Sequence, residues 1–196
     1  MKFIFTSDIH LQEDAPICRT DDYFNAQCKK LEWLKGIKEE HEAVILDAGD
    51  IFSKCYPSHW LVSKAIQMLP KGMITVPGNH DLPRHSLDLI DKSGLWVLNE
   101  AKILDVLLDK PLIYQTEGIC VQGFPYGSKI DSIKINKRKS IQYIAIIHIM
   151  TWVGGEPYPG AKNDGLEVNE LMEKLKGYDL IITGHNHSSF VVKNKD

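Results

Sequence analysis

Six short runs rich in Val, Ile and Phe, each followed at once by polar residues or glycine, constrain the fold of this 196-residue chain most strongly. Runs of this kind are typical of β-strands, and several are apolar throughout, which indicates central strands covered on both faces. Stretches with helical spacing lie between the early runs, and strands that alternate with helices indicate an α/β fold. The six predicted strands are Lys2–Thr6, Ala43–Leu46, Met73–Val76, Ile119–Gln122, Tyr143–Ile147 and Leu180–Thr183.

Four segments carry a helical pattern. In the longest, apolar residues recur every three or four positions over Phe24–Leu34, and Asp21 or Asp22 is available as the N-cap. Gly94 and Gly177 are expected to end the third and fourth helices. The four predicted helices are Asp22–Glu40, Trp60–Leu69, Leu87–Lys92 and Asp164–Lys176.

The stretch Ile103–Gln115 has no clear helical spacing and predicts a hairpin bent at Asp109-Lys110-Pro111. This hairpin implies a second sheet, partly antiparallel, that is stacked on the first. The chain contains no internal repeat, low-complexity tract or linker, and its length suits one domain. We therefore expect a single domain over residues 1–196.

Composition excludes several classes of protein. With 23 basic and 26 acidic side chains the net charge is −3, so the chain is not a uniformly basic nucleic-acid coat, although a local basic patch stays open. No apolar run reaches the ~20 residues that span a bilayer, and the first apolar run is too short for a signal peptide. The four cysteines form no CxxC pair. They are expected to be small, partly buried residues in a reducing, cytoplasmic compartment.

Polar clusters follow five of the predicted strands. Ligands of α/β sheets collect at the carboxyl ends of the strands, so these nitrogen and oxygen donors are expected to converge. Residues two apart in extended backbone face the same side, so both members of a D-x-H or H-x-H pair could reach a common centre. The five clusters are Asp8-Ile9-His10, Gly49-Asp50, Gly78-Asn79-His80-Asp81, His148 and Gly184-His185-Asn186-His187.

A set of seven carboxylate, imidazole and amide donors is too large for one metal ion. It suits two divalent metals roughly 3.5–4 Å apart that share a carboxylate. Because no thiolate contributes, Mn²⁺, Fe²⁺ or Zn²⁺ is favoured over Cu⁺ or an iron–sulfur cluster. Of these metals Mn²⁺ is the one expected, and Mg²⁺ stays an alternative. Each cluster alone would suit an ordinary turn, or for His148 a core histidine, but their order and their placement at strand ends favour metal binding. The seven predicted ligands are Asp8, His10, Asp50, Asn79, His148, His185 and His187.

The ordered set resembles the signature of the calcineurin-like metallophosphoesterase superfamily, which runs D-x-H, GD, GNH[DE], H and GHxH. The resemblance extends from Asp8 to His187, nearly the whole chain. It implies a four-layer α/β/β/α sandwich, in which two stacked mixed sheets are flanked by helices, with a dinuclear centre at one sheet edge.

The same resemblance implies a role for each residue. Asp50 bridges the two metals. His80 is not a ligand but contacts the scissile phosphate and protonates the leaving oxygen, and Asp81 orients it. The first metal is then held by Asp8, His10, Asp50 and His187, and the second by Asp50, Asn79, His148 and His185.

Within the superfamily, the chain is most similar to nuclease subunits of the SbcD type, the catalytic partners of SbcC-like ATPases in DNA-end processing. Many phosphatases of the superfamily place a second acidic residue three positions after the bridging aspartate, where this chain has Ser53. The likeness implies DNA as substrate, as single strands or duplex ends, and an ATPase partner. The similar stretches are Ser7–Leu11, Arg19–Phe24, Ala48–Phe52, Pro57-Ser58 and Val76–Pro83.

Two features depart from the SbcD pattern. Those nucleases often carry histidine or another polar side chain at the position of Ser53, where it helps to place the substrate, so exonuclease behaviour stays open. They also continue past the GHxH motif into a DNA-capping domain and an ATPase-docking segment, whereas this sequence stops nine residues after His187. We therefore expect a nuclease core domain without a capping domain, as in a shortened phage-type homologue or a truncated chain.

Two segments and one side chain could contact a polymeric substrate. Lys129–Lys139 holds five basic residues and one acid, and it is either a rim that neutralises phosphates or a solvated hairpin tip. The loop Thr151–Gly165 carries Trp152 and Tyr158, which either stack on an unpaired base or belong to a mobile surface loop. Phe52, beside Asp50, is either a substrate contact or part of the core.

Three hypotheses follow. The leading one is a Mn²⁺-dependent phosphodiesterase that acts on DNA, in which a hydroxide between the metals attacks phosphorus and His80 is the general acid. A small-molecule phosphodiesterase or phosphatase on the same centre is the alternative. A metal-free interaction scaffold is the third, and it is disfavoured because all seven donors and His80 are present.

Overall fold

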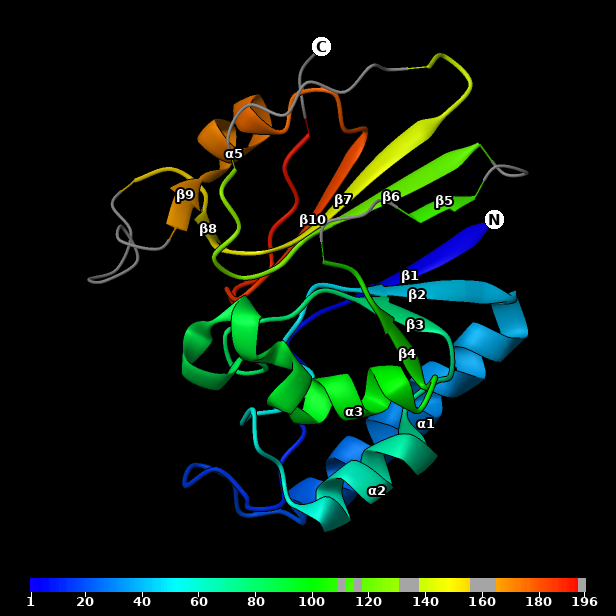
Figure 1. Cartoon of the computed structure of the whole chain (residues 1–196), viewed down its shortest axis with the longest axis vertical. Coiled ribbons are helices and arrows are strands. Elements are labelled where there is room, and N and C mark those ends of the chain that lie inside the picture. The colour runs from blue at the N-terminus through cyan, green and yellow to red at the C-terminus, as the bar shows by residue number, and fades with distance from the viewer. Residues whose placement is uncertain (109–111, 115–117, 131–137, 156–164, 194–196) are drawn as a thin grey trace.

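The computed structural model describes residues 1–108, 112–114, 118–130, 138–155 and 165–193 (Figure 1). All six predicted strands are present, with ends that differ from the prediction by at most two residues. Over these residues the chain folds into a mixed α/β structure with two four-stranded sheets and a separate pair of short strands.

The first sheet is parallel throughout its described strands, in the order β1-β2-β3-β4. Because all four strands point the same way, their carboxyl ends lie at one edge of the sheet. The prediction of two mixed sheets is therefore wrong for this sheet. Its strands are β1 (Lys2–Thr6), β2 (Ala43–Asp47), β3 (Met73–Thr75) and β4 (Leu104–Val106).

The second sheet has the order β10-β7-β6-β5. Three strands are parallel, and β5 pairs antiparallel with β6, so the predicted second, partly antiparallel sheet is confirmed. Its strands are β5 (Leu112–Tyr114), β6 (Ile119–Phe124), β7 (Gln142–His148) and β10 (Leu180–Gly184).

The predicted hairpin over Ile103–Gln115 is wrong, because its two arms belong to different sheets. β4 pairs with β3, and Leu107 continues that pairing by donating its N–H to the carbonyl of Thr75 at 2.8 Å. The side chains divide in the same way, since Leu104 packs under the helices and Leu107 between the sheets. The predicted bend at Asp109–Pro111 lies outside the described residues.

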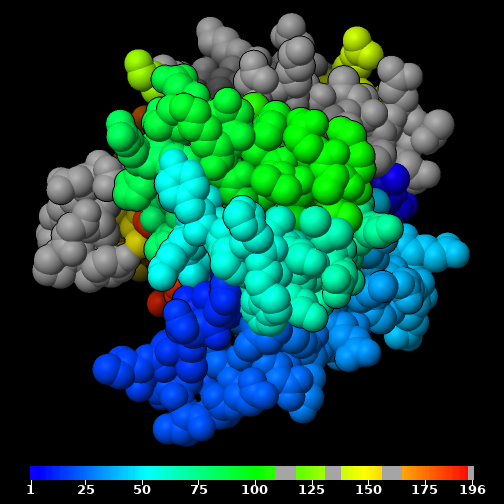
Figure 2. All heavy atoms as spheres, turned by 60° about the horizontal axis from the view of Figure 1, so that its bottom comes forward, coloured from blue at the N-terminus to red at the C-terminus, as the bar shows by residue number. Residues whose placement is uncertain are grey.

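Helices cover the first sheet on its outer face. In Figure 2, which brings the bottom of Figure 1 forward, α2 and α3 form the front of this face and α1 lies beside α2. Asp22 caps α1 as predicted, since its side chain accepts a hydrogen bond from the N–H of Asn25 at 3.1 Å. The three helices are α1 (Tyr23–His41), α2 (His59–Met68) and α3 (Gly94–Glu100).

The predicted helix Leu87–Lys92 is a 3₁₀ segment, η2, preceded by η1 (Pro83–His85). Gly94 begins a helix instead of ending one, because Ser93 caps α3 by accepting from the N–H of Trp96 at 3.2 Å. A Cβ atom on Gly94 would lie 2.3 Å from the ring of Pro57, so only glycine fits where α3 meets the loop before α2.

Three apolar clusters hold the layers together. The first joins the first sheet to α1, α2 and α3 and includes the buried Phe52, which is therefore a core residue. The second lies between the sheets, where Leu46 and Val76 meet Val121 and Ile146. The third joins the second sheet to α5 (Val168–Lys174), through Leu171 among others.

Two expectations about strands need correction. The interpretation of several apolar runs as central strands does not extend to β1 and β10, which lie at sheet edges and expose Phe5 and Leu180. The predicted loop Thr151–Gly165 begins and ends in a short parallel pair, β8 (Met150–Trp152) and β9 (Gly165–Glu167). Consequently the helix expected from Asp164 begins at Val168. Along the described chain, no helix combines the length and the apolar content needed to cross a membrane.

Candidate metal centre

The loops after β1 and β2 run side by side and carry three of the predicted ligands. The N–H of Asp8 donates to the carbonyl of Gly49, and the N–H of His10 donates to that of Asp50, both at 2.9 Å. Asp8, His10 and Asp50 all have positive φ, at 54°, 49° and 58°. The expectation that Asp8 and His10 share a face because their backbone is extended is therefore wrong. Left-handed turns, which are strained for these residues, aim both side chains inward.

The loop after β10 joins this pair through Asp8. The backbone N–H of His185 donates to both carboxylate oxygens of Asp8, at 3.0 and 3.1 Å. His185 is also in a left-handed conformation, with φ at 84°. A carboxylate of the first sheet thus fixes the ligand loop of the second sheet.

Among the described residues, three groups of side chains could each hold a metal ion, because the donor atoms within each group lie within 4.8 Å of one another. One group is Asp8, His10 and His187, in which Nε2 of His187 lies 3.6 Å from Oδ1 of Asp8. Asp50 belongs to both of the others, one with His10 and His80 and one with His148 and His185. Six of the seven predicted ligands are therefore brought together, because Asp50 is shared by two of the groups and His10 links them to the third.

Asn79, the seventh predicted ligand, lies at the same place. Its Oδ1 atom is 3.1 Å from Nε2 of His148, and that nitrogen is 3.3 Å from Oδ2 of Asp50. Both Asp50 and His148 are about 1% exposed, whereas Asn79 and His185 are half-buried.

The donor chemistry fits cations. Nδ1 of His148 lies 2.6 Å from the carbonyl of Ala48, which can only accept, so Nδ1 carries a proton. In the neutral ring, Nε2 then carries a lone pair, and this lone pair faces the Asp50 carboxylate. Nε2 of His10 and Nε2 of His187 likewise face each other at 3.2 Å, beside Asp8. A cation between these acceptors satisfies all of them, and the residues present can therefore hold two divalent metals.

The histidines differ in their pKa. Burial alone would lower the pKa of His148, but the hydrogen bond and charge of Asp50 outweigh it and raise that pKa. Burial lowers the pKa of His10 and His185 below the ordinary value, although Asp8 and Asp50 oppose it. These two rings therefore stay neutral near pH 7, which is the form that binds metal.

His80 lies beside the centre in an orientation set by Ser53. Its Nδ1 atom is 2.9 Å from the carbonyl oxygen of Ser53, and its backbone N–H donates to Oδ1 of Asp50 at 2.9 Å. Because a carbonyl only accepts, Nδ1 carries the proton and Nε2 is the nitrogen left to exchange one. The hydroxyl of Ser53 donates to the carbonyl of His10 at 2.9 Å, which ties both histidines to one residue.

The predicted role of Asp81 in orienting His80 is wrong. Asp81 is fully buried, and burial together with the charge of Asp50 raises its pKa to about 7. Its carboxylate holds the loop after β3 against the loop after β2 through backbone groups, so it positions backbone and leaves the ring to Ser53. The N–H donors to Asp81 are those of Asp50, Ile51, Phe52 and Gly78, at 2.9 to 3.4 Å.

Glycines in the motifs allow this close approach. A Cβ atom on Gly78 would lie 2.1 Å from Oδ1 of Asp50, and one on Gly184 would lie 2.3 Å from the carbonyl of Ala48. Both positions have an ordinary backbone conformation, so the requirement for glycine is one of space.

Sequence reasoning missed Asp47, a fully buried carboxylate at the end of β2. It accepts hydrogen bonds from the hydroxyls of Thr6 at 2.7 Å and Thr75 at 2.8 Å, and from the N–H of Gly49 at 2.9 Å. Asp47 therefore joins the ends of β1, β2 and β3. Burial raises its pKa to about 6. The signal available was an acid at the end of an otherwise apolar run.

Tyr126 was also missed. Its ring centroid lies 5.9 Å from that of His185 and 6.3 Å from that of His148, and His85 packs edge-on against it at 5.7 Å. It forms an aromatic wall beside these two histidines of the centre. No motif in the sequence marks it.

The predicted substrate-binding segments are only partly described. Lys129, Arg138 and Lys139 are exposed, whereas residues 131–137 and Tyr158 lie outside the described residues. Trp152 is half-buried in β8. For Lys129–Lys139, both the phosphate-neutralising rim and the solvated hairpin tip stay predictions. For the loop Thr151–Gly165, both stacking on a base and a mobile surface loop stay predictions.

These features define the class of the protein: an α/β fold with a cluster of carboxylate, imidazole and amide donors at the carboxyl ends of its strands, suited to a metal-dependent phosphoesterase. The chain belongs to the calcineurin-like phosphoesterase family, which its sequence matches over residues 1–189. Members of this family typically bind two divalent metals.

One relative is the DNA double-strand break repair protein Mre11 of Saccharolobus solfataricus. The chain is 27% identical to it over 174 residues, which are 81% of this chain and 42% of the relative. The chain thus spans less than half of the length of this relative. The SbcD likeness expected from the sequence stays a prediction.

Proposed function

We propose that this chain is a phosphodiesterase that hydrolyses DNA with two divalent metal ions, of which Mn²⁺ is favoured. The observation that carries the proposal is the position of Asp50, whose Oδ2 atom lies 3.7 Å from Nε2 of His10 and 3.3 Å from Nε2 of His148. One carboxylate between two sets of imidazoles can bridge two cations. We assign Asp8, His10 and His187 to the first metal, Asn79, His148 and His185 to the second, and Asp50 to both.

The chain's own residues then have defined tasks. When bound, the two metals neutralise phosphate oxygens and lower the pKa of a water between them. His80 gives a proton from Nε2 to the leaving oxygen, since its Nδ1 proton is engaged by Ser53. The backbone N–H of His80 donates to Asp50, which places the backbone of the proposed proton donor beside the carboxylate assigned to both metals.

Two observations support DNA as the substrate. The Mre11 relative is a DNA double-strand break repair protein. Lys129 is exposed and follows directly on Pro125–Ser128, which lines a cavity together with His148, and a basic side chain near such a cavity could neutralise a phosphate of a polymeric substrate. An SbcC-like ATPase partner and a cytoplasmic location complete the proposal, supported by the resemblance and by four cysteines that are all free.

The proposal extends to the architecture of four layers, α/β/β/α. Its support is the order of the three apolar clusters. The first joins helices to the first sheet, the second joins the first sheet to the second, and the third joins the second sheet to α5. Figure 1 lets the reader follow this succession from α2 at the bottom to α5 at the top.

A comparison of four substrates tests the function. Purified protein is stripped with EDTA, reloaded with Mn²⁺, and incubated in parallel with single-stranded DNA, duplex ends, bis-(4-nitrophenyl) phosphate and 4-nitrophenyl phosphate. We expect Mn²⁺-dependent cleavage of DNA and of the bis-ester. Asp50→Asn and His148→Asn should each lose more than about 100-fold in hydrolytic activity. Loss of a group that only supports a metal ligand already costs about 10–100-fold in metal affinity or activity.

His41→Asn, at the exposed end of α1, is the matched control and should keep full activity. Cleavage of the mono-ester alone would contradict the nuclease assignment and favour the small-molecule alternative. Failure of the protein to retain Mn²⁺ in equilibrium dialysis would overturn the metal centre itself.

A further inference from the structure

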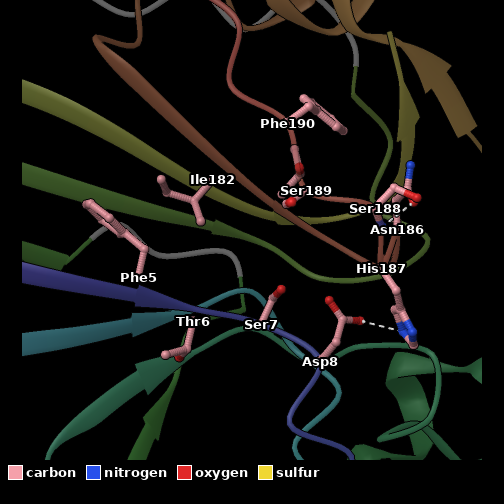
Figure 3. A pocket seen from close by; sticks show the side chains of 11 residues that line it. Phe5, Thr6, Ser7, Asp8, Ile182, Asn186, His187, Ser188, Ser189 and Phe190 are labelled. Carbon is pink, nitrogen blue, oxygen red and sulfur yellow. Dashed lines mark hydrogen bonds and ion pairs between the residues drawn. The ribbon is translucent and has the colours of Figure 1, made fainter. Parts of the chain in front are cut away.

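A pocket opens between the two edge strands, beside the proposed first metal. This edge pocket has a volume of about 510 Å³, within the range of roughly 300–1,000 Å³ that small-molecule sites occupy. Figure 3 shows Asp8 and His187 at one end, with Phe5, Ile182 and Phe190 farther along it. Two of the predicted ligands, Asp8 and His187, are therefore part of the wall of a larger cavity.

The lining of the edge pocket is aromatic and hydroxylic, and not basic. Phe5 and Phe190 supply two aromatic rings, Ser7 and Ser189 supply hydroxyls, and none of the eleven lining residues is Lys or Arg. Such a surface gives no charge to hold a phosphate. It suits a flat, neutral heteroaromatic group that stacks on rings and forms hydrogen bonds at its rim.

Phe5 is held in place although it is 42% exposed at the edge of its sheet. Its ring stacks on that of Phe3, with centroids 6.3 Å apart and planes at 22°, and Phe3 packs against the core between the sheets. A large exposed ring that is anchored from behind is a ready surface for a second ring.

The turn just before Phe190 is held by hydrogen bonds. The side chain of Asn186 donates to the carbonyl of Thr151 at 2.6 Å and accepts from the N–H of Ser188 at 2.9 Å. This turn contains His187, and Phe190 lies two residues beyond the turn and lines the same pocket as Asp8 and His187. A wall held before binding loses little freedom when a ligand arrives.

We infer that the edge pocket binds the base of the nucleoside that adjoins the scissile phosphate, and that Phe190 is the ring on which it stacks. The inference rests on the proposed function, because it requires a phosphodiester at Asp8 and His187. It names the substrate class of that site as nucleoside esters, with the base recognised by stacking.

Equilibrium binding of a fluorescent nucleoside without phosphate, 2-aminopurine deoxyribonucleoside, tests the pocket. Stacking on Phe190 should quench its fluorescence, and Phe190→Ala should weaken binding about tenfold, as loss of one stacking ring does. Phe190→Leu, which keeps apolar volume without a ring, should weaken it nearly as much, and Phe190→Trp should restore it. With thymidine 5′-(4-nitrophenyl) phosphate, Phe190→Ala should raise KM about tenfold while kcat changes little.

Trp33→Ala removes an exposed ring from α1 and is the control for loss of an aromatic side chain. It should leave nucleoside binding unchanged. Equal nucleoside affinity in Phe190→Ala and the parent, or displacement of the nucleoside by inorganic phosphate alone, would overturn the pocket. Nucleoside binding without any Mn²⁺-dependent hydrolysis would contradict the proposed function and leave the pocket inference standing. Hydrolysis without nucleoside binding would contradict the pocket inference and leave the proposed function standing.

Discussion

At the scale of single residues, the identity of each donor could be predicted but its orientation could not. His80 was recognised because it stands between Asn79 and Asp81 in a short motif. The group that orients its ring is the carbonyl of Ser53, 27 positions away, and a backbone carbonyl has no sequence signature. Asp81 was assigned to the wrong partner for the same reason, since its carboxylate binds backbone N–H groups.

Replacing His80 with Ala should separate poor leaving groups from good ones. A general acid contributes about 10²–10⁴-fold when the leaving group is an alkoxide that needs a proton, and far less for nitrophenolate. His80→Ala should therefore lose at least about 100-fold in kcat on DNA and less than about tenfold on bis-(4-nitrophenyl) phosphate. Steady-state kinetics on both substrates check this. His59→Ala, exposed at the start of α2, should match the parent, and equal losses on both substrates would remove His80 from the acid role.

At the scale of elements, the strands were predicted but their neighbours were not. An apolar run reports that a segment is buried on a sheet, and it does not say whether the strand lies at the centre or the edge. β1 and β10 lie at sheet edges, although their runs are as apolar as those of inner strands. β4 and β5 lie in different sheets, although their segment was predicted to form one hairpin. The loops that follow the strands interlock through close backbone contacts, in which Gly184 approaches the carbonyl of Ala48.

Adding one methyl group at Gly184 should loosen the centre. Its Cβ atom would lie 2.3 Å from the backbone oxygen of Ala48 and 3.0 Å from Nδ1 of His148, so one of these groups must move. We expect Gly184→Ala to cost about 1–3 kcal/mol of unfolding free energy by overpacking, and to weaken Mn²⁺ binding more than tenfold. Urea unfolding and metal titration measure the two effects.

Gly36→Ala is the matched control for this substitution. Gly36 lies inside α1 with no atom within 4 Å of its added Cβ, so the change should stabilise the protein by about 0.5–1 kcal/mol and leave Mn²⁺ affinity unchanged. Unaltered Mn²⁺ affinity in Gly184→Ala would show that the close approach of Gly184 to Ala48 is not needed for the metal centre.

At the scale of the whole molecule, the centre depends on connections between strands far apart in the chain. Asp47 joins the hydroxyls of Thr6 and Thr75 across three strands of the first sheet. Asp8 joins that sheet to the loop after β10, 177 positions away, through the N–H of His185. The stability of the molecule and the geometry of the centre are therefore linked through buried carboxylates.

The pH dependence of unfolding should report Asp47. Burial raises its pKa from 3.8 to about 6, so the folded state favours the protonated acid. Its contribution to stability is fully present below pH 3.8 and is lost as the pH rises through about 6. Asp47→Asn stays neutral at every pH. In metal-free buffer its free energy of unfolding, relative to that of the parent, should therefore rise between pH 4 and 6. Above pH 6 this gain should be on the order of 2–3 kcal/mol. Urea unfolding at pH 4, 6 and 8 measures this gain.

Asp105→Asn, at an exposed acid of β4, should stay within about 0.5 kcal/mol of the parent at every pH. A parallel pH profile for Asp47→Asn and the parent would contradict the buried charge assigned to Asp47.

The sequence by itself determined six of the strands, the helices α1 and α2, and the residue types of the seven predicted donors. These are local properties, since strand and helix periodicity and short motifs at strand ends are carried by adjacent residues. The tertiary structure alone decided which strands form the sheet edges, how Ser53, Asp47 and Asp81 support the centre, and that Phe5 and Phe190 line one pocket. Those relations depend on pairing and burial between segments up to 185 positions apart, and only the packing of the two sheets brings such segments together.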